Sequence, residues 1–266
     1  MKFSIVINSF NQSNTIERTI ISVLNQEVEK EVIVIDAGST DGSVEIINKY
    51  ANYLDVIIFN PGTDLGQSHA INQGFANSTG SILCWINSDD WFEKDGLSQI
   101  VSYFQDNKNP LTWVIASCNL WNETKKEVFS VRSVNHVDLG IILEYGSMFW
   151  IPQQSTFWRR ELFELCGPLV VSDHVTMDVE LFMRFSAISK PILSKEIVSS
   201  YSFHDQSKGS VFRKESFISQ NKLRLKYARA FKPFFVAQKL NEKNIPVHFS
   251  RAVRSDLQRY VKHLRG

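Results

Sequence analysis

Residues 31–50 read EVIVIDAGSTDGSVEIINKY and contain the two patterns that decide the fold. The first six residues are rich in Val and Ile and end in Asp36, which is typical of a strand buried on both faces. From Ser43 onward the apolar residues have helical spacing. This segment therefore predicts a strand, a polar turn and a helix.

The same alternation extends through the first hundred residues. Strands are predicted at 3–8, 31–36, 56–60 and 81–87, and helices at 15–25, 43–50, 67–77 and 94–104. Such alternation predicts an α/β fold with a doubly wound, mainly parallel sheet and helices on both faces. Ligands bind such sheets at the carboxyl ends of the strands, where this sequence places Ser9, Asp36 and residues 87–90.

The pattern changes after Pro110. Strands are predicted at 112–121, 127–131 and 195–203, some of them antiparallel, with helices at 160–166 and 176–186 and helical periodicity from Glu215. We expect a catalytic domain at 1–212, with halves at 1–110 and 111–212, followed by a helical C-terminal extension at 213–266.

Composition indicates a soluble globular chain. The 266 residues are 43% hydrophobic and 21% charged, with no apolar run long enough to span a membrane and no signal-peptide pattern at the start. The cysteines at 84, 118 and 166 lack metal-ligand spacing, so we expect reduced, buried thiols. A cytoplasmic location follows as an expectation.

Charge is divided unevenly along the chain. The segment from Arg213 to the end carries 14 Lys/Arg and 3 Asp/Glu, whereas residues 1–212 carry 15 and 25. The basic segment includes an amphipathic stretch at 251–264, which predicts peripheral contact with an anionic membrane at the inner face. The alternative is a solvated surface packed on the acidic domain or on a second copy.

Two adjacent carboxylates, Asp89 and Asp90, follow the predicted strand at 81–87. Like charges placed together at the open end of a strand favour a divalent cation and the phosphates that it carries. The alternative is the N-terminus of a helix over 92–104, where Asp is also favoured.

Several further motifs occur in a characteristic order. They are Ser9-Phe10-Asn11, DAGSTDGS at 36–43, DLGQSHAINQGF at 64–75, NSDDW at 87–91, PQQSTFWRR at 152–160 and MDVELFMR at 177–184. Together they resemble the family 2 glycosyltransferases of GT-A fold, which are inverting enzymes that use nucleotide-diphosphate sugars. The resemblance fades after about residue 212 and implies the roles that follow.

The resemblance assigns the donor nucleotide to one group of residues, namely Ser9, Phe10, Asn11, Asp36, Gly66, Gln67 and Asp89. It implies a UDP-sugar, although the base stays open because Ala37 stands where many members carry a second acidic residue. It also implies Mn²⁺ or Mg²⁺, with Asp90 as the direct ligand and Asp89 shared between ribose and metal. His204 is a further candidate for the metal or the diphosphate, or a surface loop residue.

The acceptor side of the resemblance centres on Asp178, the expected general base. Its alternative role is a favourable interaction with a helix dipole. Gln154 and Trp158 match an acceptor-binding segment, with Trp158 otherwise a core aromatic, and Lys208 is placed to neutralise the leaving diphosphate. The acceptor is expected to be a glycan or lipid-linked glycan, as in polysaccharide biosynthesis, and no nucleic-acid partner is expected.

Three other functions fit the sequence less well. A catalytically silent nucleotide- or sugar-binding module of the same fold is disfavoured by the intact Asp89, Asp90 and Asp178. A dinucleotide-dependent oxidoreductase lacks its Gly-x-Gly-x-x-Gly turn after the first strand. Nucleotidyl transfer usually needs a basic, glycine-rich phosphate loop after the first strand, and the sequence has none there.

Overall fold

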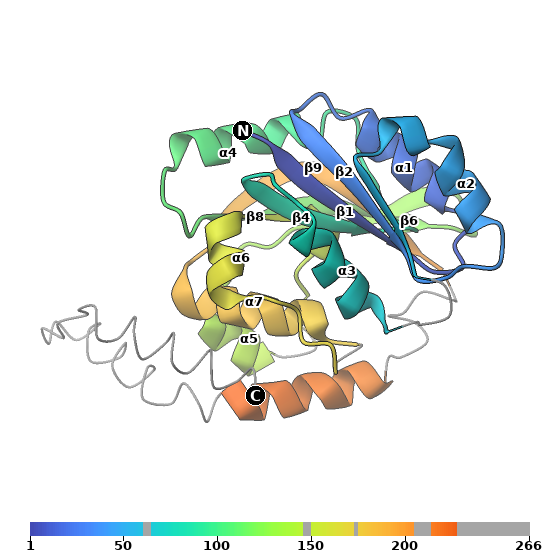
Figure 1. Cartoon of the computed structure of the whole chain (residues 1–266). Helices are drawn as coiled ribbons and strands as arrows, with labels where there is room; N and C mark the ends of the chain where they lie inside the picture. Colours follow the sequence, from blue (N-terminus) through green and yellow to red (C-terminus); the bar gives the residue numbers. More distant parts are fainter. Residues whose placement is uncertain (61–64, 146–149, 173–174, 205–213, 228–266) are drawn as a thin grey trace, which may run out of the picture.

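One mixed sheet runs through the part of the chain that this computed structural model describes, namely residues 1–60, 65–145, 150–172, 175–204 and 214–227 (Figure 1). Its strands are β1 (Phe3–Ser9), β2 (Lys30–Asp36), β3 (Val56–Phe59), β4 (Ile82–Asn87), β5 (Trp91–Phe92), β6 (Trp113–Asn122), β7 (Glu127–Arg132), β8 (Thr156–Arg159) and β9 (Ile192–Phe203). The four strands predicted in the first hundred residues are confirmed to within one residue at each end.

The sheet has a parallel part and a mixed part. Strands β3, β2, β1 and β4 are parallel neighbours, and the order continues through β8, β6, β9 and β5, with β7 paired to β6. Strand β8 is antiparallel to β4 and β6, whereas β9 runs parallel to β6. The expected antiparallel members after residue 110 are thus confirmed.

Helices cover both faces of the sheet, which confirms the doubly wound arrangement (Figure 1). One face packs on α1 (Ile16–Leu24), α2 (Ser43–Lys49) and α4 (Ser98–Asp106); the other packs on α3 (Gln67–Ala76), α5 (Leu139–Tyr145), α6 (Arg160–Cys166) and α7 (Met177–Ile188). Short 3-10 turns lie at η1 (Ala51–Tyr53) and η3 (Gln153–Ser155). Helix α4 begins four residues later than predicted because residues 94–97 form a turn, in which Asp95 has a left-handed φ of 58°.

Helix α3 approaches β1 very closely. A Cβ atom added at Gly74 would lie 2.5 Å from Cγ1 of Val6, so only glycine allows this distance. The approach fixes the beginning of α3 beside the carboxyl ends of β1 and β4, where the polar residues gather.

A further helix spans residues 214–227, in the segment assigned above to the C-terminal extension (orange in Figure 1). Its Tyr227 side chain is fully buried and belongs to the same hydrophobic cluster as α7. Leu223 packs against that cluster as well. This helix is therefore packed on the same unit as α7, and the amphipathic stretch at 251–264 lies outside the described residues.

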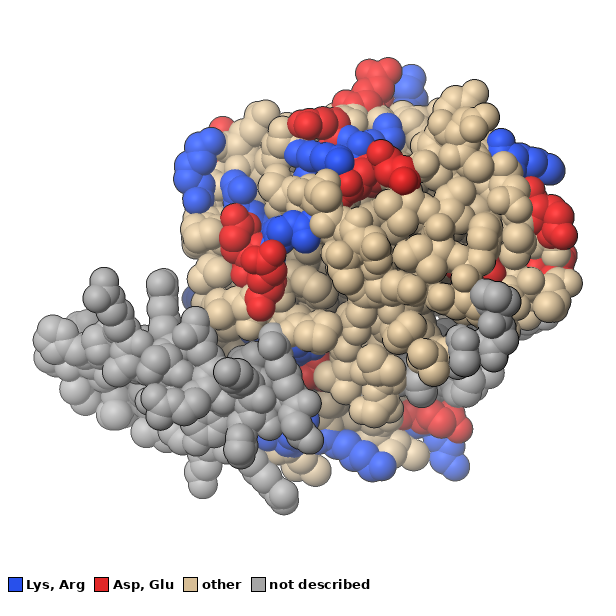
Figure 2. Space-filling view, in the orientation of Figure 1, with Lys and Arg blue, Asp and Glu red and all other residues tan. Residues whose placement is uncertain are grey.

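The cysteines, the helices and the surface charges can be compared with what the composition predicts. Cys84, Cys118 and Cys166 are free and buried, as predicted. Within the described ranges, no helix is both long and apolar enough to cross a bilayer. On the face drawn in Figure 2, acidic and basic side chains of the described residues are interspersed.

Candidate functional site

Two loops meet at the carboxyl ends of β1 and β2. The Asp36 carboxylate is fully buried and accepts hydrogen bonds from the backbone N–H groups of Gly38 (3.0 Å) and Ser39 (2.7 Å) and from the Ser39 hydroxyl (2.7 Å). Asn11, at a left-handed φ of 52°, donates its N–H to Ser39 Oγ at 2.8 Å. Asp36 thus shapes the loop that Asn11 contacts.

The neighbouring residues of this loop pair differ in exposure. Ser9 is buried at the end of β1, whereas the Phe10 side chain is 45% exposed. Phe10 therefore offers an aromatic face at the sheet edge, beside the loop that Asp36 holds.

The beginning of α3 reaches the end of β4. Gly66 precedes the helix with φ 85°, a left-handed value that favours glycine. Gln67, the first helical residue, donates its Nε2–H to Asn87 Oδ1 at 2.6 Å. This hydrogen bond links two candidate donor-side segments.

Asp89 and His204 lie together at the ends of β4 and β9. His204 Nε2 is 3.1 Å from Asp89 Oδ2, and both side chains are about one-fifth exposed, at 21% and 20%. The hydrogen bond to Asp89 raises the pKa of His204, although partial burial opposes the shift. Asp89 and His204 therefore form a hydrogen-bonded pair that solvent can reach.

Arg18 of α1 supports this pair from behind. Its Nη2 donates to the Asp89 carbonyl at 3.0 Å, and its guanidinium lies 3.9 Å from the centre of the Trp91 ring. Nη1 is 3.3 Å from a carboxylate oxygen of Glu123. No local sequence pattern marks Arg18, because α1 and the end of β4 meet only in the folded chain.

Asp90, the expected direct metal ligand, lies away from solvent at the end of β4. The side chain is fully buried, and Oδ1 accepts the backbone N–H of Ser202 at 2.8 Å. Burial, followed by the nearby Asp89 charge, raises the pKa of Asp90 well above its usual range. Asp90 therefore ties β4 to β9, and Asp89 is the member of the motif that reaches solvent.

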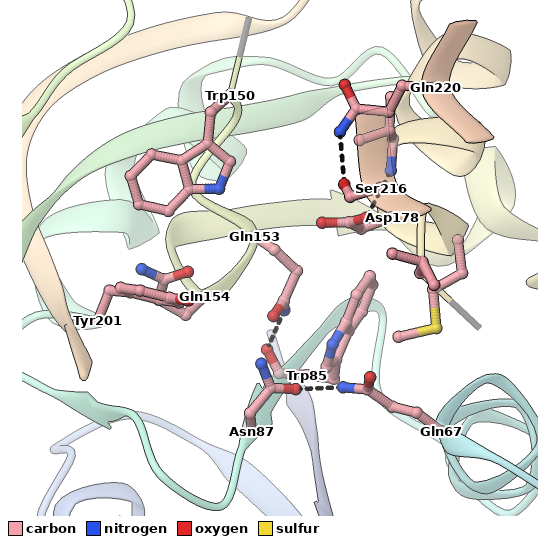
Figure 3. Close-up of a pocket in the computed structure, with 13 residues that line it drawn as sticks. Gln67, Trp85, Asn87, Trp150, Gln153, Gln154, Asp178, Tyr201, Ser216 and Gln220 are labelled. Carbon is pink, nitrogen blue, oxygen red and sulfur yellow. Dashed lines mark hydrogen bonds between the residues drawn. The ribbon is translucent and has the colours of Figure 1, made fainter. Parts of the chain in front are cut away.

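A cavity of about 190 Å³ opens beside these segments (Figure 3). The described residues that line it are Gln67, Trp85, Asn87, Trp150, Gln153, Gln154, Val175, Met177, Asp178, Val179, Tyr201, Ser216 and Gln220. Asp178 is the second residue of α7, and its Oδ1 accepts the N–H of Val179 at 2.8 Å. The cavity therefore brings the expected base together with Gln67 and Asn87 of the donor side.

Gln154 and Trp158, the two expected acceptor-binding residues, lie in different environments. Gln154 lines the cavity and is only 2% exposed. Trp158, by contrast, is fully buried among aromatic rings, with its ring centre 5.5 Å from that of Trp85. The expectation that Trp158 meets the acceptor is wrong because β8 directs this ring into the core.

Other residues take the aromatic and polar places around the cavity. Trp150 and Tyr201 form an edge-to-face pair with ring centres 5.3 Å apart. Ser216 and Gln220 come from the helix over 214–227. Trp150 lies two residues before Pro152 of the PQQS segment, so its position in the sequence could have marked it, whereas no motif marks Gln220. Lys208 lies outside the described residues.

Comparison with known proteins gives consistent results. The sequence profile of "Glycosyl transferase family 2" matches residues 4–164. An uncharacterized glycosyltransferase of Nostoc sp. is 30% identical over 178 residues, which cover 64% of this chain and 54% of that protein. A PGL/p-HBAD biosynthesis glycosyltransferase of Mycobacterium tuberculosis is 27% identical over 194 residues, covering 72% and 71%. The chain thus spans about half the length of the Nostoc relative.

Solved structures share the fold. S. aureus TarS 1-349 in complex with UDP superimposes with a TM-score of 0.64 at 19% identity, covering 84% of this chain and 64% of that one. The mannosyltransferase PcManGT from Pyrobaculum calidifontis, in complex with GDP-Man and Mn²⁺, gives a TM-score of 0.62 at 18% identity, covering 90% and 69%. At these identities the similarity is one of fold, a GT-A-type sheet with helices.

Proposed function

The chain belongs to glycosyl transferase family 2, and we propose that it transfers a sugar from a nucleotide-diphosphate donor to a hydroxyl of a glycan or lipid-linked glycan, with inversion. One observation carries the proposal. Asp178 and the donor-side residues Gln67 and Asn87 line the same cavity, although they come from opposite ends of the matched motifs. A base and a donor must share one space for direct transfer.

The donor is proposed to lie across the carboxyl ends of β1, β2 and β4. Phe10 and Asn11 would meet the base and ribose, and Asp36 would act by holding the loop over 37–39. The structures similar in fold are complexes with UDP and with GDP-Man, so the choice of UDP stays part of the proposal.

Asp89 and His204 would hold a divalent cation at the diphosphate. No cluster of three or more His, Cys, Asp or Glu ligands exists among the described residues, so phosphate oxygens would complete the coordination. A site with one carboxylate oxygen and one imidazole nitrogen suits Mn²⁺ better than Mg²⁺, which prefers oxygen ligands. The Pyrobaculum structure was solved with Mn²⁺. When bound, the cation supplies positive charge to the leaving diphosphate.

Asp178 is proposed to accept the proton of the acceptor hydroxyl as its oxygen attacks the anomeric carbon. The carbon–oxygen bond to the diphosphate breaks in the same displacement, and the nucleoside diphosphate leaves with the electron pair. Because attack and departure occur on opposite faces, the anomeric configuration inverts. A single carboxylate is sufficient for this step.

The silent binding module remains the alternative, and product formation separates the two. Wild-type protein would be incubated with Mn²⁺ and each of UDP-glucose, UDP-galactose, UDP-GlcNAc, GDP-mannose and dTDP-rhamnose, and released nucleoside diphosphate measured. Release from one of these donors, abolished by EDTA, supports transfer or hydrolysis. Tight binding of a donor without any release favours the silent module.

Action on polysaccharide precursors at the inner face of a membrane belongs to the same proposal. It rests on the basic composition of residues 213–266.

A further inference from the structure

The cavity beside Asp178 has a distinctive chemical lining. Among the described residues, its polar groups are five side-chain amides, two hydroxyls, two indole N–H groups and the Asp178 carboxylate, with no Lys, Arg or His. An anionic group bound here would meet a carboxylate and no described cation, which is unfavourable in a partly enclosed space. Amides and hydroxyls are instead suited to neutral hydroxyl groups.

Two amide atoms on this lining are buried without an oxygen or nitrogen hydrogen-bond partner among the described residues. Gln220 Oε1 has none, while the Nε2 of the same side chain donates to Ser216 Oγ at 3.2 Å. Gln154 Nε2 has no oxygen or nitrogen acceptor among the described residues, and its one printed contact is a weak hydrogen bond with the Cys118 sulfur. Buried polar atoms are normally hydrogen-bonded, so a ligand that both donates and accepts hydrogen bonds would satisfy Gln220 Oε1 and Gln154 Nε2. A sugar hydroxyl does so.

An aromatic wall faces Gln220 across the cavity (Figure 3). Figure 3 shows Trp150 and Tyr201 on one side of the cavity and Asp178, Ser216 and Gln220 on the other. The C–H face of a sugar ring packs well on indole and phenol rings, while its hydroxyls point sideways to polar groups. The space between the two walls therefore has the lining of a sugar site.

The helix that carries Gln220 is held firmly against α7. The Tyr227 hydroxyl donates to the Glu180 carboxylate, which Arg184 also contacts at 2.6 and 2.9 Å. Glu180 lies two residues after Asp178 on α7. The position of Gln220 is thus tied to that of the expected base.

We propose that the acceptor is a neutral glycoside whose ring packs on Trp150 and Tyr201, and that Gln220 is an acceptor-specificity residue contributed by the helix over 214–227. The proposal rests on the function proposed above and narrows it. It favours the hydroxyl of a neutral sugar over a lipid phosphate, a sugar phosphate or a uronic acid as the group that approaches Asp178.

The test is ligand-observed NMR on the full chain with Mn²⁺ and UDP or GDP, whichever binds. The probes are the methyl glycosides of glucose, galactose, mannose, GlcNAc and rhamnose, with glucose 1-phosphate and methyl glucuronide as charged counterparts. We expect saturation transfer to at least one neutral glycoside and at least tenfold weaker binding of the charged probes. Gln220→Met removes the amide at nearly constant volume, and we expect it to weaken the glycoside by about threefold to tenfold.

Gln105→Met provides the matched control, because Gln105 is exposed on α4, and it is expected to bind like wild type. Trp150→Ala is expected to weaken the glycoside as well, which tests the aromatic wall separately. Preferential binding of a charged probe, no binding of any neutral glycoside, or equal affinity in Gln220→Met and wild type would each overturn the inference. Nucleoside diphosphate release from a nucleotide sugar, measured separately on wild type, shows whether the proposed function itself has failed.

Discussion

Asp89 Oδ2 and His204 Nε2 lie 3.1 Å apart, although 115 residues separate them in the chain. The contact exists because β4 and β9 both end at this edge of the sheet and Asp90 ties the two ends together through the Ser202 N–H. Arg18 holds the Asp89 backbone from α1. Contacts within the chain therefore position the pair.

Asp89→Asn and His204→Ala are expected to lower the Mn²⁺-dependent affinity for nucleoside diphosphate at least tenfold, because each removes a proposed ligand. Asp90→Asn keeps an oxygen that can accept the Ser202 N–H, so we expect a change of no more than about threefold in the same calorimetric titration. The exposed Asp95→Asn is the control. Loss of Mn²⁺ dependence in Asp90→Asn, with its retention in Asp89→Asn, would contradict this proposal and assign the direct ligand to Asp90, as the sequence motif implies.

Asp178→Asn is nearly isosteric and removes the proposed base. We expect transfer to slow by about 10² or more while the donor dissociation constant stays within about threefold of wild type. Turnover and donor affinity would be measured together, with the exposed Asp106→Asn as the matched control. A parallel fall in both quantities would assign Asp178 to donor binding or folding instead.

Tyr227→Phe removes one hydrogen bond to the buried Glu180 carboxylate. Leaving a buried acceptor less satisfied costs about 1–3 kcal/mol, so we expect the free energy of unfolding in urea to fall by that amount. Tyr53→Phe, at a 69% exposed site, is expected to change it by less than about 0.5 kcal/mol. Equal stability of both variants would mean that the helix over 214–227 is not docked through this contact.

Glu31 predicts a specific acid sensitivity. Burial alone would raise its pKa, but hydrogen bonds from Lys2, Ser4 and Thr79 lower the pKa to about 2. Its contribution to stability is therefore present above its ordinary pKa near 4.5 and is lost as pH falls towards 2. Glu31→Gln is expected to cost about 1–3 kcal/mol at pH 7, with the difference from wild type shrinking in acid.

The exposed Glu27→Gln is the control for this pH series, followed by urea unfolding at each pH. A constant difference between wild type and Glu31→Gln from pH 7 to pH 3 would show that the carboxylate does not act through its charge.

The parallel half of the sheet was largely predictable because each of its strands and helices has a recognisable local sequence pattern. Buried strands such as 31–36 are continuous apolar runs, and their helices have periodic apolar faces. Strand β8 has only four residues and no such pattern. The prediction placed the beginning of α4 four residues too early, because residues 94–97 form a turn that a long-range hydrogen bond holds, from the Leu97 N–H to Gln26 Oε1.

The candidate site was predictable where motifs exist and not elsewhere. Ordered motifs predict Asp89 and Asp178, and the family resemblance adds His204. Trp150 and Trp158 flank the same polar segment, and only the packing of β8 decides which ring enters the core. Gln220 was missed because its helix is positioned by Tyr227 and Glu180, a contact between residues 47 positions apart.

The basic segment beyond Tyr227 is predicted to bind an anionic membrane. We expect salt-sensitive co-flotation of the full chain with phosphatidylglycerol vesicles, lost when the chain ends at Tyr227. This truncation keeps the docked helix, whereas one after Phe212 would remove a core residue. No vesicle binding by the full chain at low salt would remove the membrane hypothesis.

The anomeric configuration of the first product tests the central claim most directly. Wild-type protein with Mn²⁺ would be mixed with the α-linked nucleotide sugar that it binds, with water as the acceptor, and the anomeric protons followed by NMR before mutarotation. The account predicts that the β-anomer and nucleoside diphosphate appear together, through one displacement assisted by Asp178. Initial release of the α-anomer would contradict it, as would a bound donor that is never consumed.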